Sequence, residues 1–183
     1  SVMSSKIILN SNQLNILINR LVCQLIENHN DFSNTVLIGL QPRGVYFLSR
    51  IISLLKNKYN RKNINYGLLD ITFFRDDFRR HNKPLNPNIS DMNVKIESKS
   101  VVLIDDVLYT GRSIRAALTA IETYGRPKFI ELLILIDRRF SRELPIHPNY
   151  TGVEVDSIQN DRVTVNWKDN ESEDSVYLIN SQW

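Results

Sequence analysis

The chain is poor in several features that mark particular classes of protein. Its 183 residues include one cysteine, Cys23, which excludes an intramolecular disulfide and is typical of a reducing compartment. No apolar run approaches the roughly 18 residues that span a bilayer, and no signal peptide is visible. The three histidines, His29, His81 and His147, have no metal-ligand spacing and lie in polar surroundings. We therefore expect a cytoplasmic protein without membrane attachment, whose histidines are solvated.

A large excess of charge of one sign is also lacking. Lys and Arg number 23 and Asp and Glu number 20, so the formal net charge is only +3 and the pI is about 9.0. This balance permits an anionic ligand or nucleic acid as partner without requiring either. A length of 183 residues with 42% hydrophobic content predicts one domain over residues 1–183, with no internal repeat and no linker. We interpret Ser1 and Val2, which precede Met3, as a remnant of cloning.

The most informative pattern lies between residues 101 and 113. Four apolar residues, Val101 to Ile104, predict a buried strand of a parallel sheet, and two adjacent carboxylates, Asp105 and Asp106, follow them. A Thr-Gly-Arg-Ser turn at 110–113 then leads into an amphipathic helix. In open α/β sheets ligands bind beyond the carboxyl ends of the strands, and the first N–H groups of a helix bind anions. Two acids suited to sugar hydroxyls or a metal, beside an anion site, predict the binding of a phosphorylated sugar.

Other nucleotide-binding and catalytic patterns are absent. The turn lacks the Gly-Lys-Ser/Thr ending of a nucleoside triphosphatase loop, and the chain has no Gly-x-Gly-x-x-Gly pattern of dinucleotide-binding proteins. No Ser-His-Asp, Cys-His or zinc-ligand spacing competes with the acid pair. Two adjacent acids alone would favour a solvated turn after a strand. The turn and helix that follow at a fixed distance favour a binding site instead.

The remaining elements alternate between strands and helices. Helical spacing of apolar residues predicts helices from about 11 to 26, from 45 to 56 and from 113 to 124. Strands are predicted at 35–40, 65–74, 101–104 and 129–136, with short strands at 153–155, 162–167 and 175–179. This order predicts an α/β fold with a mostly parallel central sheet flanked by helices, and a small β-appendage that shapes the sheet edge or roofs the site. Residues 75–98 are long and polar, and such a segment inside a compact domain is usually functional.

At this point the chain resembles a known family. The run 101–113 is similar to the signature for phosphoribosyl diphosphate (PRPP) of type I phosphoribosyltransferases. Two further runs, Ile-Thr-Phe-Phe-Arg-Asp-Asp at 71–77 and Asp-Arg-Arg-Phe-Ser-Arg-Glu-Leu-Pro-Ile at 137–146, resemble a narrower group. This is the PyrR family of bifunctional pyrimidine-operon regulators and uracil phosphoribosyltransferases, and the resemblance extends from about residue 9 to about residue 179.

The resemblance implies both a fold and an activity. The fold is that of type I phosphoribosyltransferases. The activity is a Mg²⁺-dependent transfer of the phosphoribosyl group of PRPP to uracil, which yields UMP and pyrophosphate in pyrimidine salvage. The resemblance also implies a homodimer or larger homo-oligomer.

Roles for individual residues also follow from the resemblance. Asp105 and Asp106 would hold the ribose 2- and 3-hydroxyls and act as the catalytic acids, either by stabilising positive charge on the ribose or by accepting a proton. Arg138 is the first candidate for contact with the base. The 5-phosphate would be bound by Thr110, Gly111, Arg112 and Ser113, and the pyrophosphate by Gln41, Pro42, Arg43 and Gly44. If the pyrophosphate loop contains a cis peptide, Gln41–Pro42 is the expected place, because proline lowers its cost from about 3 to about 1 kcal/mol.

The long polar segment and the metal complete the expected site. Residues 75–98 match the mobile catalytic loop of the family, from which Arg75 or Arg79 would add positive charge to the departing oxygens. A solvated surface hairpin is the alternative for this segment. No dedicated metal-ligand set is implied. Mg²⁺ would be held through the substrate, with Asp105 or Asp106 as the protein ligand.

Two other functions remain open. The first is a UMP-sensing, RNA-binding regulator of pyrimidine genes with little catalysis, and the second is a purine phosphoribosyltransferase. The first helix disfavours the regulator, because its only Lys or Arg is Arg20, and polar positions elsewhere carry Asn12, Asn15, Asn19 and Cys23. Relatives commonly have Asp-Arg-Gly-His-Arg-Glu-Leu-Pro where residues 137–145 of this chain are Asp-Arg-Arg-Phe-Ser-Arg-Glu-Leu-Pro. This difference leaves the base contact, and any RNA contact through the same segment, undecided.

Overall fold

The computed structural model describes residues 2–74, 90–158 and 160–182. Arg75 and Arg79, with the rest of the expected catalytic loop up to residue 89, lie outside the described residues, so their roles stay predictions. None of the described helices is both long and apolar enough to cross a membrane.

Five parallel strands form the central sheet, as the sequence predicted. From one edge to the other they are β3 (Asn65–Leu69), β2 (Thr35–Leu40), β4 (Ser100–Leu108), β5 (Phe129–Arg139) and β6 (Tyr150–Asp156). The apolar run from Val101 to Ile104 lies in the central strand, where every side chain is fully buried. In a strand that is covered on both faces every side chain is buried, so polar and apolar residues do not alternate along it. This explains the continuous apolar run.

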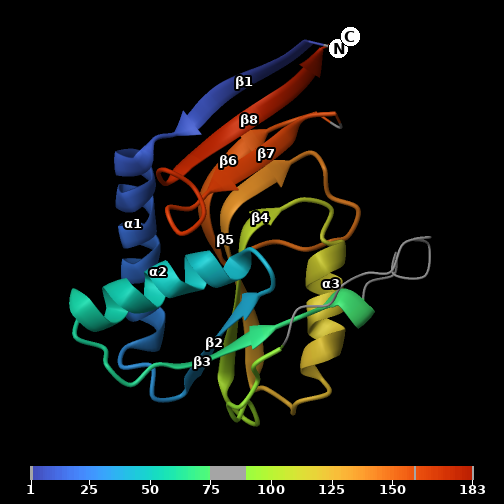
Figure 1. Ribbon diagram of the computed structural model, residues 1–183. Helices are drawn as coiled ribbons and strands as arrows, with labels where there is room; N and C mark the ends of the chain where they lie inside the picture. Colours follow the sequence, from blue (N-terminus) through green and yellow to red (C-terminus); the bar gives the residue numbers. More distant parts are fainter. Residues whose placement is uncertain (1, 75–89, 159, 183) are drawn as a thin grey trace.

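Helices cover both faces of this sheet (Figure 1). On one face lie α1 (Ser11–His29) and α2 (Gly44–Asn57), and on the other lies α3 (Arg112–Ile121). Successive residues of a strand point to opposite faces, so Leu37 packs towards α1 and α2 while Val36 packs towards α3. Helix α1 is capped at its start, because the Asn10 side chain accepts from the N–H of Gln13 at 2.9 Å.

A second, antiparallel sheet stands at one end of the molecule. Its strand order is β1 (Val2–Leu9), β8 (Ser175–Gln182) and β7 (Arg162–Asn166), and the two chain termini lie together at its outer end (Figure 1). We call this sheet, together with the loop 167–174 between β7 and β8, the hood. The predicted β-appendage is thus confirmed. Strand β1 was not predicted, because its pairing partner lies at the opposite end of the chain.

The predicted strand at 65–74 is wrong in its second half. Strand β3 ends at Leu69, and residues 72–74 form a short 3₁₀ helix. The cause is local, because the Asp70 carboxylate accepts from the N–H of Thr72 at 3.1 Å and from its hydroxyl at 2.6 Å. Side-chain bonds of this kind compete with the ladder of a sheet and turn the chain away from it. The predicted helix 113–124 is also shorter, since α3 ends at Ile121.

One histidine is not solvated as expected. The His29 side chain, at the end of α1, is only 4% exposed, and its Nε2 lies 2.6 Å from Glu131 Oε1. Its Nδ1 lies 2.7 Å from the hydroxyl of Thr35, and the Tyr150 hydroxyl donates to Glu131 at 3.0 Å. These residues join α1 to the amino ends of the strands. The cluster therefore lies at the end of the sheet opposite to the carboxyl ends of the strands. His147 is exposed, and His81 lies outside the described residues.

Candidate active site

The side on which successive strands join the sheet changes between β2 and β4. From β2 the chain proceeds to β3 on one side, then crosses to β4 on the other side and continues outward to β5 and β6. In such a sheet the connections after the two inner strands diverge, and ligands bind in the crevice between them. The segments that leave β2 and β4 here are 41–44 and 105–113, the two that the sequence singled out.

The acid pair lies on a projecting part of β4. Strands β2 and β4 stay paired only as far as Gly39 and Ile104, whereas β4 pairs with β5 as far as Leu108. The sequence had suggested that the strand ends before Asp105. In the structure it continues through Asp105 and Asp106. The N–H of Asp106 donates to Asp105 Oδ1 at 2.9 Å. Both carboxylates are thus held on extended backbone at the edge of the crevice.

A glycine holds the predicted pyrophosphate loop, residues 41–44, against these acids. A Cβ atom at Gly44 would lie 2.7 Å from the carbonyl oxygen of Ile104 and 3.2 Å from Asp105 Oδ1. Only glycine therefore allows α2 to begin this close to β4. The Gln41–Pro42 peptide bond is cis, which confirms the hypothesis made from the sequence.

Arg43 connects three parts of the molecule. It is the N-cap residue of α2, and its Nε lies 3.2 Å from Asp106 Oδ2. Its Nη2 donates to the carbonyl oxygen of Val165 in β7. The Arg43 side chain is half exposed, whereas that of Asp106 is 7% exposed. The guanidinium thus pairs with a buried acid while keeping a face towards solvent, where an anion can reach it.

A cavity of about 200 Å³ lies between these segments. It is lined by Leu40, Gln41, Pro42, Arg43, Asp70, Ile71, Thr72, Asp105, Asp106 and Ser113. The structure therefore brings together both predicted acids, three residues of the predicted pyrophosphate loop and Ser113. Asp70 and Thr72 were not among the predicted site residues, because they were assigned to a strand. Gly44, Thr110, Gly111 and Arg112 do not line this cavity.

The two acids have different electrostatic surroundings. Burial, followed by the neighbouring charge of Asp106, raises the pKa of Asp105 well above its usual value. Asp106 has the Arg43 guanidinium beside it. The site therefore holds one carboxyl that is costly to ionise next to one whose negative charge is paired.

The predicted phosphate-binding turn stands at the start of α3. Gly111 has a φ of +95°, which favours glycine, and α3 begins at the next residue. The backbone N–H of Arg112 donates to the Thr110 hydroxyl at 3.2 Å. The Nε atom of Arg112 lies 2.6 Å from Glu143 Oε2. The four predicted residues, 110–113, therefore surround the amino end of a helix, where an anion is stabilised.

Arg142 supports this turn, and sequence reasoning did not single it out. Its guanidinium donates to the carbonyl of Tyr109 at 2.5 Å, to the carbonyl of Ile146 at 3.0 Å and to Asp137 at 2.5 Å. One buttressing side chain thus joins the segment before the turn to the end of β5. The only signal in the sequence was its place in the run 137–146, which carried the family resemblance.

Arg138 lies behind the turn and not in the cavity of the acids. It is 6% exposed, and its guanidinium carbon lies 4.0 Å from the ring centre of Tyr109. It donates to the Ser157 hydroxyl at 3.0 Å and to the carbonyl of Asp161 at 2.8 Å. A second cavity, of about 460 Å³, is lined by Tyr109 and Ser157. Arg138 therefore lies behind a wall of this second cavity, and its contact with a base stays a prediction.

Comparisons with known proteins show which family the chain resembles. Residues 4–170 match the Phosphoribosyl transferase domain family. The chain is similar to a bifunctional protein PyrR of Microcystis aeruginosa, with 41% identity over 94% of this chain and 96% of the relative. A bifunctional protein PyrR of Latilactobacillus sakei is 39% identical over 94% of this chain and 97% of the relative.

Solved structures share the fold at low sequence identity. A hypoxanthine phosphoribosyltransferase of Trypanosoma cruzi aligns with a TM-score of 0.69 at 15% identity, covering 97% of both chains. One from Staphylococcus aureus aligns with a TM-score of 0.66 at 19% identity, covering 86% of this chain and 80% of its own. At these identities the likeness establishes the fold alone.

Proposed function

The chain belongs to the PyrR family of phosphoribosyltransferases, and we propose that it transfers the phosphoribosyl group of PRPP to uracil, giving UMP and pyrophosphate. The observation that supports this proposal is the cavity in which Arg43, Asp105 and Asp106 meet Ser113. A cation, two carboxylates and the start of a helix match the three parts of PRPP, which are its pyrophosphate, its ribose hydroxyls and its 5-phosphate.

The reaction forms one bond and breaks another at C1 of the ribose. N1 of uracil bonds to C1, the bond from C1 to the pyrophosphate oxygen breaks, and the N1 proton is released. Positive charge develops on the ribose while negative charge grows on the leaving group. Asp106, which pairs with Arg43, is suited to hold the ribose hydroxyls and stabilise the sugar, and Arg43 to bind the pyrophosphate. Asp105, with its raised pKa, is the carboxyl better suited to take up a proton.

Mg²⁺ fits the chemistry of these acids. Among residues 2–74, 90–158 and 160–182 no three His, Cys, Asp or Glu side chains gather as a ligand set. Mg²⁺ characteristically binds one or two carboxylates and completes its shell with substrate oxygens and water. The charge of Asp106 contributes to the raised pKa of Asp105, so a cation would relieve repulsion there. We propose that Mg²⁺ is held through PRPP, with Asp105 or Asp106 as the protein ligand, where the ion would neutralise charge on the leaving group.

The remaining parts of the proposal concern the base, the catalytic loop and the assembly. We place the base near the stack of Arg138 on Tyr109, which adjoins the phosphate-binding turn. Arg75 or Arg79 would close over the pyrophosphate. Arg20 donates to the carbonyls of Thr151 and Gly152, so the one cation of α1 is engaged within the fold, which favours catalysis over RNA regulation. A cytoplasmic homodimer or larger assembly completes the proposal.

Product formation from PRPP and Mg²⁺ tests this function directly. Uracil, hypoxanthine and guanine are offered in parallel, and the double variant Asp105→Asn/Asp106→Asn serves as the blank. We expect UMP from uracil and no product from the blank. Purine nucleotide formation instead would assign the protein to the purine enzymes. PRPP binding without turnover of any base would indicate that the protein is a nucleotide-sensing RNA-binding protein and not an enzyme.

A further inference from the structure

One face of α2, counted from its N-cap residue Arg43, carries a row of contacts to the hood. Arg43, Tyr46, Phe47 and Arg50 are spaced by three, four and seven residues from the first, so they lie on one side of the helix. All four contact the hood segment 165–174. The same helix begins at the loop to which we assign the pyrophosphate. It is therefore a rigid connection between that loop and the hood.

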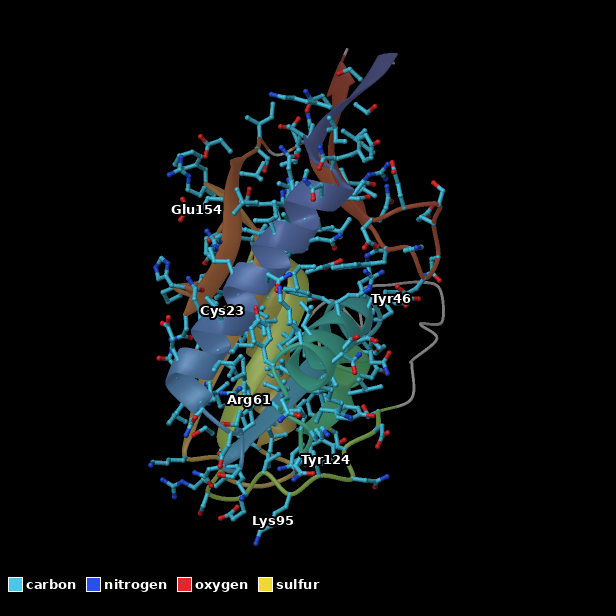
Figure 2. The ribbon with its side chains drawn as sticks, turned by 90° about the vertical axis from the view of Figure 1, so that its left-hand side faces the viewer. Cys23, Tyr46, Arg61, Lys95, Tyr124 and Glu154 are labelled. Atoms are coloured by element: carbon cyan, nitrogen blue, oxygen red, sulfur yellow. The ribbon has the colours of Figure 1, made fainter. Side chains whose placement is uncertain are left out.

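Three of these contacts lie close to the pyrophosphate loop. Arg43 donates to the carbonyl of Val165, and the Asn170 amide donates to the Tyr46 hydroxyl at 2.5 Å. Tyr46 is labelled in Figure 2. The ring of Phe47 stacks on that of Trp167, with the centroids 5.8 Å apart.

Arg50 makes ion-pair contacts to the hood, two turns along the helix. Its guanidinium forms a two-pronged ion pair with the Asp174 carboxylate, at 2.6 and 2.9 Å, and also lies 3.2 Å from Asp169. Asp174 is only 6% exposed, and it also accepts from the N–H of Lys168 at 2.6 Å. Such planar, paired contacts fix orientation as well as distance, which a lysine cannot reproduce. The guanidinium carbon of Arg50 also lies 5.8 Å from the ring centre of Trp167.

We propose that Arg50 is a positioning residue that couples occupation of the pyrophosphate loop to the placement of the hood. This inference rests on the proposed pyrophosphate site. A polyanion that draws Arg43 away from Val165 removes one of the contacts on this face of α2. The Arg50–Asp174 pair then determines the position that the hood takes relative to the helix. The proposed base position at Arg138 adjoins the hood, because Arg138 donates to the carbonyl of Asp161, directly before β7. A base there would meet its site only when the loop is occupied, which is a coupling between two ligands.

Trp167 provides a reporter for the coupling. It is 1% exposed and packs between Phe47 and Arg50, and its indole N–H has no hydrogen-bond partner among the described residues, so packing alone holds it. The chain has one other tryptophan, Trp183. The substitution Trp183→Phe leaves Trp167 as the single tryptophan whose emission is measured. In that variant we would titrate inorganic pyrophosphate and follow the tryptophan emission, with binding measured separately by calorimetry. Ribose 5-phosphate, which lacks the pyrophosphate, is the ligand control.

We expect pyrophosphate to change the emission of Trp167 saturably and ribose 5-phosphate to leave it unchanged. In Arg50→Gln, pyrophosphate should still bind, with an affinity within about twofold, and the emission change should vanish. In turnover, the KM for the base should rise about tenfold in this variant while the KM for PRPP stays within about twofold. Arg61→Gln removes a cation that bonds to the carbonyls of Asn30 and Tyr59, beyond the far ends of α1 and α2; it is the matched control and should behave like the parent.

Other results would overturn the inference. Binding of pyrophosphate to the parent without a change in emission, or an emission change that persists in Arg50→Gln, would mean that the helix does not couple the two sites. An equal rise of both KM values in Arg50→Gln would reduce Arg50 to a purely structural role. If calorimetry detects no pyrophosphate binding in the parent, the proposed pyrophosphate site itself fails, and the inference fails with it.

Discussion

Arg43 and Asp106 form an ion pair across the crevice, with Nε of the arginine 3.2 Å from Oδ2 of the aspartate. Half of the arginine side chain is in contact with solvent, whereas the aspartate side chain is only 7% exposed. The guanidinium therefore pairs with a buried acid and can meet a polyanion on its solvent-facing side. The pair holds the cation in place before the substrate arrives.

Removing this cation should weaken pyrophosphate binding. In Arg43→Gln we expect the affinity for inorganic pyrophosphate, measured by calorimetry, to fall about tenfold to a hundredfold. A hydrogen bond to a charged group contributes about 1.5–3 kcal/mol, and each 1.4 kcal/mol is about a factor of ten. Arg139→Gln is the control, because its side chain is similarly exposed and pairs with Asp156 away from the site. An unchanged affinity in Arg43→Gln would place the pyrophosphate elsewhere.

Replacing Asp105 should stabilise the protein while abolishing its activity. Its folded pKa is raised, so its contribution to stability is complete below the unfolded value of about 3.9 and is lost as the pH rises towards the folded pKa. Asparagine keeps the oxygen that accepts from the Asp106 N–H but cannot ionise. We expect Asp105→Asn to melt a few degrees higher at neutral pH, with the difference disappearing near pH 3 to 4. Thermal melts across this pH range test this.

Asp156 offers a control of opposite sign. The Arg139 guanidinium, which donates a hydrogen bond to it, lowers the pKa of Asp156. Its contribution to stability is therefore present above the unfolded pKa and is lost as the pH falls through the folded one. Asp156→Asn should melt slightly lower at neutral pH, not higher. If Asp105→Asn also melts lower at neutral pH, burial of the Asp105 carboxyl does not strain the folded state.

The cluster around His29 should govern stability in alkali. Burial raises the pKa of Tyr150 to about 12, with the Glu131 carboxylate adding to the shift. Stability from this hydroxyl is complete below the usual tyrosine pKa of about 10 and is lost as the pH rises from there towards about 12. Tyr150→Phe should lower the unfolding free energy by about 1 kcal/mol near neutral pH and flatten its decline in alkali. Denaturant unfolding at several pH values measures both effects, and an unchanged alkaline slope would contradict the assignment.

Two glycine substitutions separate the site from the fold. A Cβ at Gly44 would press on Ile104 and Asp105, and one at Gly152 would lie 2.3 Å from the carbonyl oxygen of Leu135. Because backbone must shift in both cases, we expect Gly44→Ala and Gly152→Ala each to cost about 1–3 kcal/mol in stability. PRPP binding by the folded fraction, measured by calorimetry, should be lost only in Gly44→Ala. Equal loss in both variants would show a general effect of destabilisation.

Local patterns in the sequence were sufficient for most elements and for the outline of the site. The apolar run before Asp105, the turn at 110–113 and the proline of the cis bond all act within a few residues. Their chemistry is decided by hydrogen bonds and sterics between near neighbours, which sequence spacing records. The alternation of strands and helices then predicted the parallel sheet and the edge at which its ligands bind.

The tertiary structure alone decided which distant residues complete the site. Arg50 and Asp174 are separated by 124 positions, and strand β1 pairs with the other end of the chain. His29, although bracketed by polar residues in the sequence, is buried because Glu131 and Thr35 come to it from two strands. No periodicity records such pairings, since they depend on how the sheet and helices pack after each has formed. The sequence by itself therefore determined the elements and the chemistry at the strand ends, and packing decided the contacts that hold the hood over them.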